Sequence, residues 1–300
     1  MQKKSGLKVL STRGELEDWR HELSKNIARE VGKEPNQRPL IGFVPTMGAL
    51  HHGHMSLIRE ARNSCQNVVV SIFVNPLQFA PNEDFAKYPR TFEKDKQMCE
   101  EAGVDVIFHP TVDVMYPGGQ EGTTRVVPPP QLEKTLYGIY RPPFFSGVAT
   151  VVNRLFNLVQ PQVAFFGEKD YQQLLVIKKM VFDLQMPIEI VGVETVREAD
   201  GLASSSRNVF LDEQQRKDSP LLQATLQEIK AASLADPAGL EKHLAAGKEK
   251  ISKLANVDLK YLVACNAETL EELTTAVLPM VLLVAAKFRE VWLIDTLVVR

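Results

Sequence analysis

The stretch that decides the fold is Ile41-Gly-Phe-Val-Pro-Thr-Met-Gly-Ala-Leu-His-His-Gly-His54. Its apolar start, Ile41 to Val44, predicts a buried strand, and an amphipathic stretch beginning near Met55 predicts a helix. A strand, a glycine-bearing loop and a helix form a pocket for a phosphate chain, because the first N–H groups of the helix are unpaired and its dipole favours anions. Three of the six histidines stand at this helix start, where they can donate hydrogen bonds to phosphate oxygens.

Strand-like and helix-like segments alternate through the first two thirds of the chain. This repetition predicts an α/β fold, a Rossmann-like doubly wound parallel sheet with helices on both faces. Ligands of such sheets bind at the carboxyl ends of the strands, so we expect the polar loops after these strands to converge on one rim. The predicted strands after the first are 68–74, 104–108, 163–166 and 188–192, and the predicted helices are 91–102, 147–159 and 170–184.

The pattern changes after the strand-like run 188–192. A charged helical stretch at 212–232, a turn at 235–239 and a further helix are followed by strand-like runs. We therefore expect a Rossmann-like domain over residues 1–185 and a smaller C-terminal α+β domain over residues 186–300. The runs that predict the strands of the second domain are 259–265, 280–286 and 291–299.

Composition is that of an ordinary globular protein. The 300 residues are 44% hydrophobic and 24% charged, which allows a substantial core and excludes disordered and fibrous classes. The net charge of −2 gives no general attraction for nucleic acid. Cys65, Cys99 and Cys265 are odd in number and widely spaced, which predicts reduced thiols and neither a disulfide framework nor a zinc site.

The sequence predicts a cytoplasmic protein with no membrane contact. The longest apolar run, residues 276–286, is interrupted by Pro279 and is too short to span a bilayer. The opening residues Met1-Gln-Lys-Lys-Ser lack the apolar core of a secretory signal.

Two strand-end loops supply candidate phosphate and substrate contacts. In His51-x-Gly-His54, Gly53 allows a close approach of the backbone to a ligand, flanked by two imidazoles. The alternatives are ordinary polar residues at a helix start, or a metal site, which no nearby carboxylate or cysteine would complete. In Asn75-Pro-Leu-Gln-Phe79, turn formation explains Asn75, whereas Gln78 is suited to orient a small polar substrate.

Two further loops complete the set. Lys169, in Gly167-Glu-Lys-Asp170, is a natural partner for a nucleotide phosphate. Asp170 and Gln173 match a helix capping box, so we interpret Asp170 as structural and expect Lys169 and Gln173 to face the ligand. The hydroxyls and guanidinium of Ser204-Ser-Ser-Arg-Asn208 suit a phosphate chain, although serine runs also occur in surface loops. For Lys87, Arg90 and Arg141 contact with the phosphates is one alternative, and solvated surface charge is the default expectation.

These segments together resemble the pantothenate synthetase (pantoate–β-alanine ligase) family, which belongs to the nucleotidyltransferase superfamily with an HxGH motif. The resemblance runs from about residue 41 to residue 211. It rests on Pro45-Thr-Met-Gly-Ala-Leu-His-x-Gly-His54, Phe73-Val-Asn-Pro-x-Gln-Phe79, Tyr88-Pro-Arg-Thr91, Gly147-Val-Ala-Thr-Val-Val152, Phe156-Asn-Leu-Val-Gln-Pro161, Phe166-Gly-Glu-Lys-Asp170, Val196-Arg-Glu-Ala-Asp-Gly-Leu-Ala203 and Ser205-Ser-Arg-Asn208.

The resemblance implies an ATP-dependent, AMP-forming ligase that condenses pantoate and β-alanine to pantothenate through a pantoyl adenylate and releases pyrophosphate. It also implies Mg²⁺ with the ATP but no resident metal site, a homodimer, and a mobile C-terminal lid domain. We expect catalytic roles for His54, His51 and Lys169. The substrate-binding residues implied for pantoate and β-alanine are Gln78 and Gln173. The ATP-binding residues implied are Met47, Gly48, Ala49, Leu50, His51, His52, Gly53, His54, Gly167, Glu168, Lys169, Asp170, Val196, Ser204, Ser205, Ser206 and Arg207.

Four places depart from the family pattern, and two alternative functions stay open. Phe144 stands where histidine is usual, Ser204 replaces leucine or methionine, Val263-Ala-Cys-Asn266 replaces an acidic pair, and Trp292 replaces arginine. One alternative is another adenylate-forming enzyme, but an aminoacyl-tRNA synthetase would carry a lysine-rich loop and a basic surface. The other is a non-catalytic nucleotide-binding homologue, against which the retained histidines, Lys169 and Arg207 argue.

Overall fold

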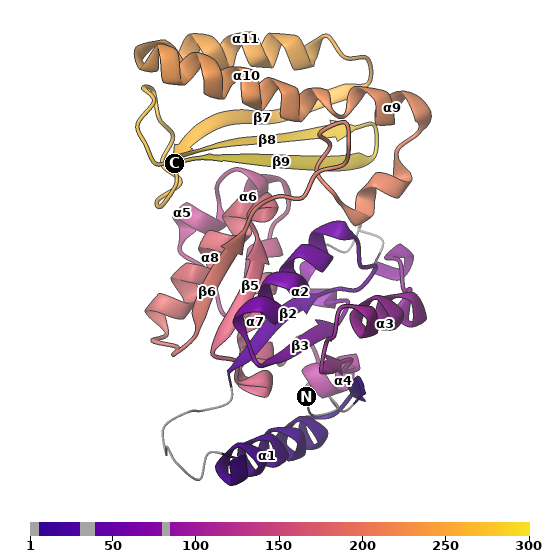
Figure 1. Ribbon diagram of the computed structural model, residues 1–300. Helices are drawn as coiled ribbons and strands as arrows, with labels where there is room; N and C mark the ends of the chain where they lie inside the picture. The colour runs from indigo at the N-terminus through magenta and orange to yellow at the C-terminus, as the bar shows by residue number, and fades with distance from the viewer. Residues whose placement is uncertain (1–5, 31–39, 80–84) are drawn as a thin grey trace.

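The larger of two sheets has six parallel strands in the order β1-β4-β3-β2-β5-β6. The computed structural model describes residues 6–30, 40–79 and 85–300, and Figure 1 shows this sheet in the middle of the molecule. The predicted Rossmann-like fold is thereby confirmed. The strands are β1 (Lys8–Leu10), β2 (Ile41–Thr46), β3 (Asn67–Ile72), β4 (Val106–Phe108), β5 (Val163–Gly167) and β6 (Glu189–Val193).

Helices cover both faces of this sheet because its central strands are apolar on both sides. Side chains alternate along each strand, so Val44 packs in one core with α2 and α3, while its neighbour Phe43 packs in the other with α1, α7 and α8. The helices of this part of the chain are α1 (Arg13–Glu30), α2 (His52–Ser64), α3 (Phe92–Glu101), α4 (Val112–Met115), α5 (Pro130–Glu133), α6 (Tyr137–Tyr140), α7 (Phe144–Val159) and α8 (Tyr171–Asp183).

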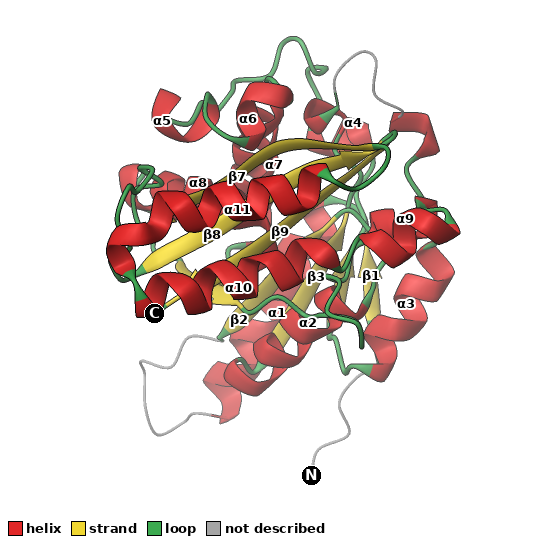
Figure 2. Cartoon of the chain, turned by 90° about the horizontal axis from the view of Figure 1, so that it is seen from above, coloured by secondary structure: helices red, strands yellow, loops and turns green. Residues whose placement is uncertain are grey.

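The smaller sheet is antiparallel and lies between two helices and the larger domain. Figure 2 shows α10 and α11 lying across one of its faces. The opposite face contributes Val263, Cys265, Val281 and Leu283 to the core that contains α7 and α8. The two domains therefore share one apolar core. The elements are α9 (Glu213–Asp218), α10 (Leu221–Ala235), α11 (Leu240–Ser252), β7 (Val257–Asn266), β8 (Met280–Phe288) and β9 (Val291–Val299).

Two positions that depart from the family pattern lie at the contact between the domains. The ring of Trp292, on β9, lies 5.7 Å from the ring of Tyr137 and 5.7 Å from that of Tyr140, measured between centroids. Val263, in the run 263–266 that departs from the family pattern, is buried in the shared core. Both positions therefore supply apolar contact between the domains.

Two details differ from the predicted elements. The helix predicted over 212–232 is divided into α9 and α10 around Ser219 and Pro220, because proline lacks the N–H that a continuous helix needs. Strand β6, which a boundary at 185/186 would assign to the second domain, pairs along its whole length with β5. The domain boundary stays a proposal, and this pairing favours a position after Val193.

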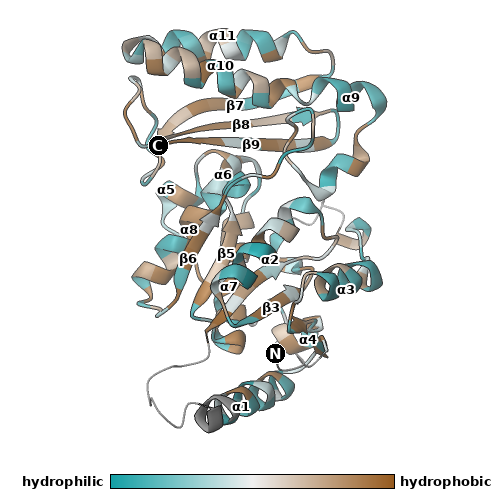
Figure 3. Cartoon of the chain, in the orientation of Figure 1, coloured by the Kyte–Doolittle hydropathy of each residue, from teal (hydrophilic) through white to brown (hydrophobic). Residues whose placement is uncertain are grey.

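Hydrophobic side chains are concentrated in the strands of the two sheets (Figure 3). Figure 3 shows hydrophobic strands in the interior, a mostly hydrophilic α3, and mixed hydrophobic and hydrophilic residues on α10 and α11. Cys65, Cys99 and Cys265 are free and buried. Within residues 6–30, 40–79 and 85–300, every helix is too short or too polar to cross a membrane. Residues 1–5, which carried the expectation about a secretory signal, lie outside the described residues.

Candidate active site

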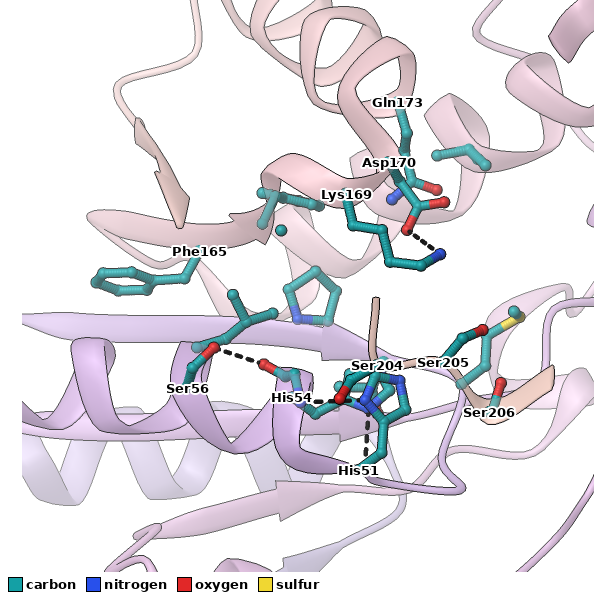
Figure 4. Close-up of a pocket in the computed structure, with 18 of the residues that line it drawn as sticks. His51, His54, Ser56, Phe165, Lys169, Asp170, Gln173, Ser204, Ser205 and Ser206 are labelled. Carbon is teal, nitrogen blue, oxygen red and sulfur yellow. Dashed lines mark hydrogen bonds and ion pairs between the residues drawn. The ribbon is translucent and has the colours of Figure 1, made fainter. Parts of the chain in front are cut away.

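The candidate site lies at the carboxyl ends of β2 and β5. Strand β2 has β3 on one side and β5 on the other, so the order in which successive strands are added to the sheet reverses at β2. Ligands of doubly wound sheets bind at such a switch point. A cavity of about 220 Å³ opens there. All four predicted loops contribute to its wall, and Figure 4 shows His51 and His54 facing Lys169 across it.

The histidine loop, residues 47–54, is stabilised by hydrogen bonds between its backbone N–H groups and its own imidazoles. Helix α2 begins at His52, three residues earlier than predicted, with His51 as its N-cap. Nδ1 of His51 accepts from the N–H of Gly53 at 3.1 Å, and Nδ1 of His54 accepts from the N–H of His51 at 3.3 Å. A Cβ atom on residue 53 would lie 2.8 Å from Cε1 of His51, so only glycine leaves this ring in place.

These hydrogen bonds set the chemistry of both rings. A neutral imidazole whose Nδ1 accepts a hydrogen bond carries its proton on Nε2, so we assign both histidines as Nε2–H donors. Burial, with a smaller effect of Lys169, lowers the pKa of His51 to about 4. Burial, with smaller effects of His51 and Lys169, lowers the pKa of His54 to about 3. Both rings are therefore neutral donors at pH 7, and Lys169 supplies the positive charge.

A buried carboxylate that the sequence reasoning missed fastens the histidine loop. Asp95, on α3, is 1% exposed and accepts from the N–H groups of Ala49 at 2.9 Å and Leu50 at 2.8 Å. The hydroxyl of Thr91 donates to the same carboxylate at 3.2 Å. The loop conformation needs such support, because Ala49 is a non-glycine residue with φ of 50°.

The Lys169 turn differs from its predicted local structure. Residues Glu168–Asp170 form a 3-10 turn, η3, that leads directly into α8. Asp170 makes no side-chain cap hydrogen bond, so the predicted capping box with Gln173 is wrong. The carboxylate of Asp170 lies 3.9 Å from Nζ of Lys169, and the side chain of Lys169 is 16% exposed.

The serine loop, residues 204–208, forms a compact turn beside Lys169. Ser204 donates its N–H to the carbonyl of Val196 at 2.9 Å. Oγ of Ser205 accepts from the N–H of Arg207 at 3.2 Å and so caps the 3-10 turn η4 (Ser206–Phe210). Ser206 forms a hydrogen bond with Tyr88, a further cavity residue, and burial raises the pKa of this phenol.

Gln78, a predicted substrate contact, is oriented by Asn75. Oε1 of Gln78 accepts from Nδ2 of Asn75 at 2.9 Å, which fixes the orientation of the Gln78 amide. Arg141, expected on the surface, is in fact 8% exposed. It donates to the carbonyl of Gln78 at 3.3 Å and lies 4.6 Å from the ring centroid of Phe144. The pattern Arg-Pro-Pro-Phe-Phe gave no signal of this burial.

The structure brings most of the predicted site residues together. Those that line the cavity are Met47, His51, Gly53, His54, Gln78, Gly167, Lys169, Asp170, Gln173, Val196, Ser204, Ser205, Ser206 and Arg207. Five others implied by the resemblance are outside its lining: Gly48, Ala49, Leu50, His52 and Glu168.

Those five residues have other surroundings. The N–H of Gly48 donates to the hydroxyl of Thr46 at 3.1 Å, and Asp95 takes the next two amides. The side chain of His52 is exposed. Glu168 is buried and forms an ion pair with Arg300. These residues shape the loops around the cavity.

The donor set fits a Mg²⁺ ion shared with a ligand. Among the described residues there is no group of three or more His, Cys, Asp or Glu side chains that could hold a metal ion alone. The carboxylates of Asp170 and Glu194 nevertheless line the cavity. Mg²⁺ is usually bound by one or two carboxylates together with substrate phosphates, so these two side chains suit it.

Comparison with known proteins gives consistent matches over nearly the whole chain. A sequence profile described as pantoate-beta-alanine ligase matches residues 9–298, well beyond the motifs at 41–211. A pantothenate synthetase of Thermus thermophilus is 49% identical over 257 residues, which cover 86% of this chain and 92% of that protein. A crystal structure of pantothenate synthetase from the same species superposes with a TM-score of 0.85 at 45% identity, covering 97% of this chain and 98% of that one.

A second solved structure carries ligands. Pantoate-beta-alanine ligase from Francisella tularensis, complexed with beta-gamma ATP and beta-alanine, matches with a TM-score of 0.75 at 31% identity. The match covers 98% of both chains.

Proposed function

The chain belongs to the pantoate–β-alanine ligase family, and we propose that it joins pantoate to β-alanine through a pantoyl adenylate at the cavity between β2 and β5. The observation that carries this proposal is the grouping of His51, His54 and Lys169 around one cavity, with Gln78 and Gln173 in the same wall. The Francisella tularensis relative, solved with an ATP compound and beta-alanine, supports the choice of ligands.

In the proposed first step, a carboxylate oxygen of pantoate attacks the α-phosphorus of ATP. The bond from that phosphorus to the bridging oxygen breaks, and pyrophosphate leaves. An anion must approach an anionic chain, so the barrier is largely electrostatic, and positioned donors lower it. We assign this work to the Nε2–H groups of His51 and His54 and to the ammonium of Lys169. Ser205, Ser206 and Arg207 anchor the phosphates.

In the second step, the amine of β-alanine attacks the acyl carbon of the adenylate. The bond from that carbon to the phosphate oxygen breaks, AMP leaves, and the new amide nitrogen gives up its proton. Gln78 and Gln173 would hold the pantoyl group, because glutamine amides pair with hydroxyl and carboxylate groups. The buried Gln78 and the partly buried Phe144 beside the cavity would limit hydrolysis of the adenylate by water.

Mg²⁺ would be held by Asp170 and Glu194 together with phosphate oxygens, where it would supply positive charge. A homodimer in the cytoplasm remains part of the proposal, on the family resemblance.

The test is pantoate-dependent exchange of labelled pyrophosphate into ATP in the absence of β-alanine. The proposal predicts exchange that requires pantoate, and formation of pantothenate and AMP in equal amounts when β-alanine is added. Exchange that requires an amino acid and not pantoate would favour another adenylate-forming enzyme. ATP binding without any exchange would favour the non-catalytic alternative.

A further inference from the structure

Two consecutive residues of the C-terminal strand β9, Asp295 and Thr296, contact both phosphate-binding loops. Each is 4% exposed. Neither was singled out by its sequence, because both lie in a strand of the smaller domain, about a hundred residues beyond the loops they contact.

Thr296 holds the Lys169 turn. Its hydroxyl donates to the backbone carbonyl of Lys169 at 2.9 Å. This carbonyl lies in the 3-10 turn η3, a short element whose hydrogen bonding within the turn is weak. The hydroxyl therefore fixes the backbone from which the Lys169 side chain extends into the cavity.

Asp295 holds the start of the serine loop. Its two carboxylate oxygens accept from the two terminal nitrogens of Arg197, at 2.7 Å and 3.0 Å, in a bidentate ion pair. Arg197 also donates to the carbonyl of Gly201 at 3.1 Å, and it forms a β-bridge with Ala203. Ser204 follows directly, so the ion pair fixes the base of the segment 204–207.

The two contacts are coupled to each other. The guanidinium of Arg197 donates to the carbonyl of Thr296 at 3.1 Å, and the N–H of Thr296 donates to the carboxylate of Asp295 at 2.7 Å. Side chains alternate along the strand, so β9 packs against other elements on both of its faces. Leu293 packs toward α10 and α11, and Ile294 packs toward the larger domain.

We propose that Asp295 and Thr296 are positioning residues for the nucleotide site, which hold Lys169 and the segment 204–207 at a fixed separation. This inference rests on the proposed function, because it takes both loops as phosphate contacts. It assigns to the smaller domain a part in building the site: a displacement of β9 would move both loops together.

Thr296 allows a test with closely matched variants. Thr296→Val removes the hydroxyl at nearly constant volume, and Thr296→Ser keeps it. A lost hydrogen bond of this kind corresponds to about a three- to tenfold change in an equilibrium constant. We expect Thr296→Val to raise the dissociation constant for ATP, measured by calorimetry, by about that factor, and Thr296→Ser to restore it. The KM for β-alanine should stay near the wild-type value, because Asn75 holds Gln78 independently.

Thr225 supplies the control for the chemical change itself. It is a fully buried threonine of α10 whose hydroxyl has no hydrogen-bond partner among the described residues. Thr225→Val should leave ATP binding unchanged. Asp295→Asn should weaken ATP binding more than Thr296→Val, because it removes the negative charge and one of the two hydrogen bonds that Asp295 accepts from Arg197.

The outcomes separate this inference from the proposed function. Unchanged ATP binding in folded Thr296→Val, or no rescue by serine, overturns the positioning role, whatever the activity of the wild type. Wild-type protein that binds ATP but forms no pantothenate overturns the proposed function, and the ATP dissociation constants of the variants still decide the inference. Wild-type protein that does not bind ATP overturns both.

Discussion

The backbone N–H of His51 donates to Nδ1 of His54 at 3.3 Å, and the two ring centroids lie 4.0 Å apart. The histidines are thus one unit, in which the start of α2 orients both rings. Because Nδ1 is an acceptor in each ring, both present Nε2–H, and both are neutral at pH 7. The helix start therefore offers hydrogen-bond donors to a phosphate chain without placing two further cations beside Lys169.

The neutral histidines predict a pH dependence of stability. Their pKa values are lowered in the folded protein, to about 4 and about 3, from an ordinary 6.5. Between these values and 6.5 the unfolded chain binds more protons, so the free energy of unfolding should fall as the pH falls from 7 to 4. Urea denaturation across this range measures it. The double variant His51→Gln/His54→Gln should show a shallower dependence, and an equal dependence in both proteins would contradict the assignment.

Asp95 is predicted to support the histidine loop through both of its oxygens. Asp95→Asn leaves one acceptor and turns an amide NH₂ toward an N–H group, so we expect a loss of about 1–3 kcal/mol in the free energy of unfolding. Weaker ATP binding should accompany it. Denaturation and calorimetry measure the two effects, with exposed Asp113→Asn as the control. Wild-type ATP affinity in Asp95→Asn would show that the loop does not depend on this carboxylate.

Arg141 is predicted to affect pantoate more than ATP. The guanidinium of Arg141 donates to the hydroxyl of Tyr137 at 2.9 Å and to the carbonyl of Gln78. Lysine would keep the charge but could not make both hydrogen bonds in this geometry. We expect Arg141→Lys to raise the KM for pantoate about tenfold, as for loss of a charged hydrogen bond. Steady-state kinetics with each substrate varied in turn measure this, and exposed Arg13→Lys is the control. A larger effect on the KM for ATP would place Arg141 elsewhere in the mechanism.

Trp292 is predicted to stabilise the contact between the domains. Its ring meets those of Tyr137 and Tyr140, so Trp292→Ala should lower the free energy of unfolding by about 2–3 kcal/mol. Trp292→Phe keeps an aromatic ring and should lose less. Chemical denaturation of the three proteins decides this, and an alanine variant as stable as wild type would show that the aromatic contacts contribute little.

Much of the fold could be predicted because the central strands are continuous apolar runs. Strands β2, β3 and β5 are buried on both faces, and this burial needs an unbroken run such as residues 68–74. Strand β1 has three residues and only partial burial, so its sequence carries no comparable pattern. The break between α9 and α10 was signalled by Pro220, which the charged helical pattern around it outweighed.

The site could be predicted where a residue with a side chain suited to phosphate lies in a loop that follows a predicted strand. His51 and His54 lie at the start of the helix that follows β2, and Lys169 lies in the turn that follows β5. The topology of the sheet brings the ends of these two strands together. Asp95 and Arg141 could not be found this way, because their partners lie 46 and 63 residues away along the chain. The capping-box pattern of Asp170 was misleading, since the 3-10 turn before α8 directs this side chain toward Lys169 instead.

The most direct test of the central claim is the rate of pantoate-dependent pyrophosphate exchange in His54→Ala and Lys169→Ala. Loss of one donor to charge that develops in the transition state costs about a hundredfold or more in rate, so each variant should fall at least that far while remaining folded. His109→Ala and Lys178→Ala, which remove exposed side chains of the same types, should keep the wild-type rate. Near-normal exchange in both His54→Ala and Lys169→Ala would contradict the account.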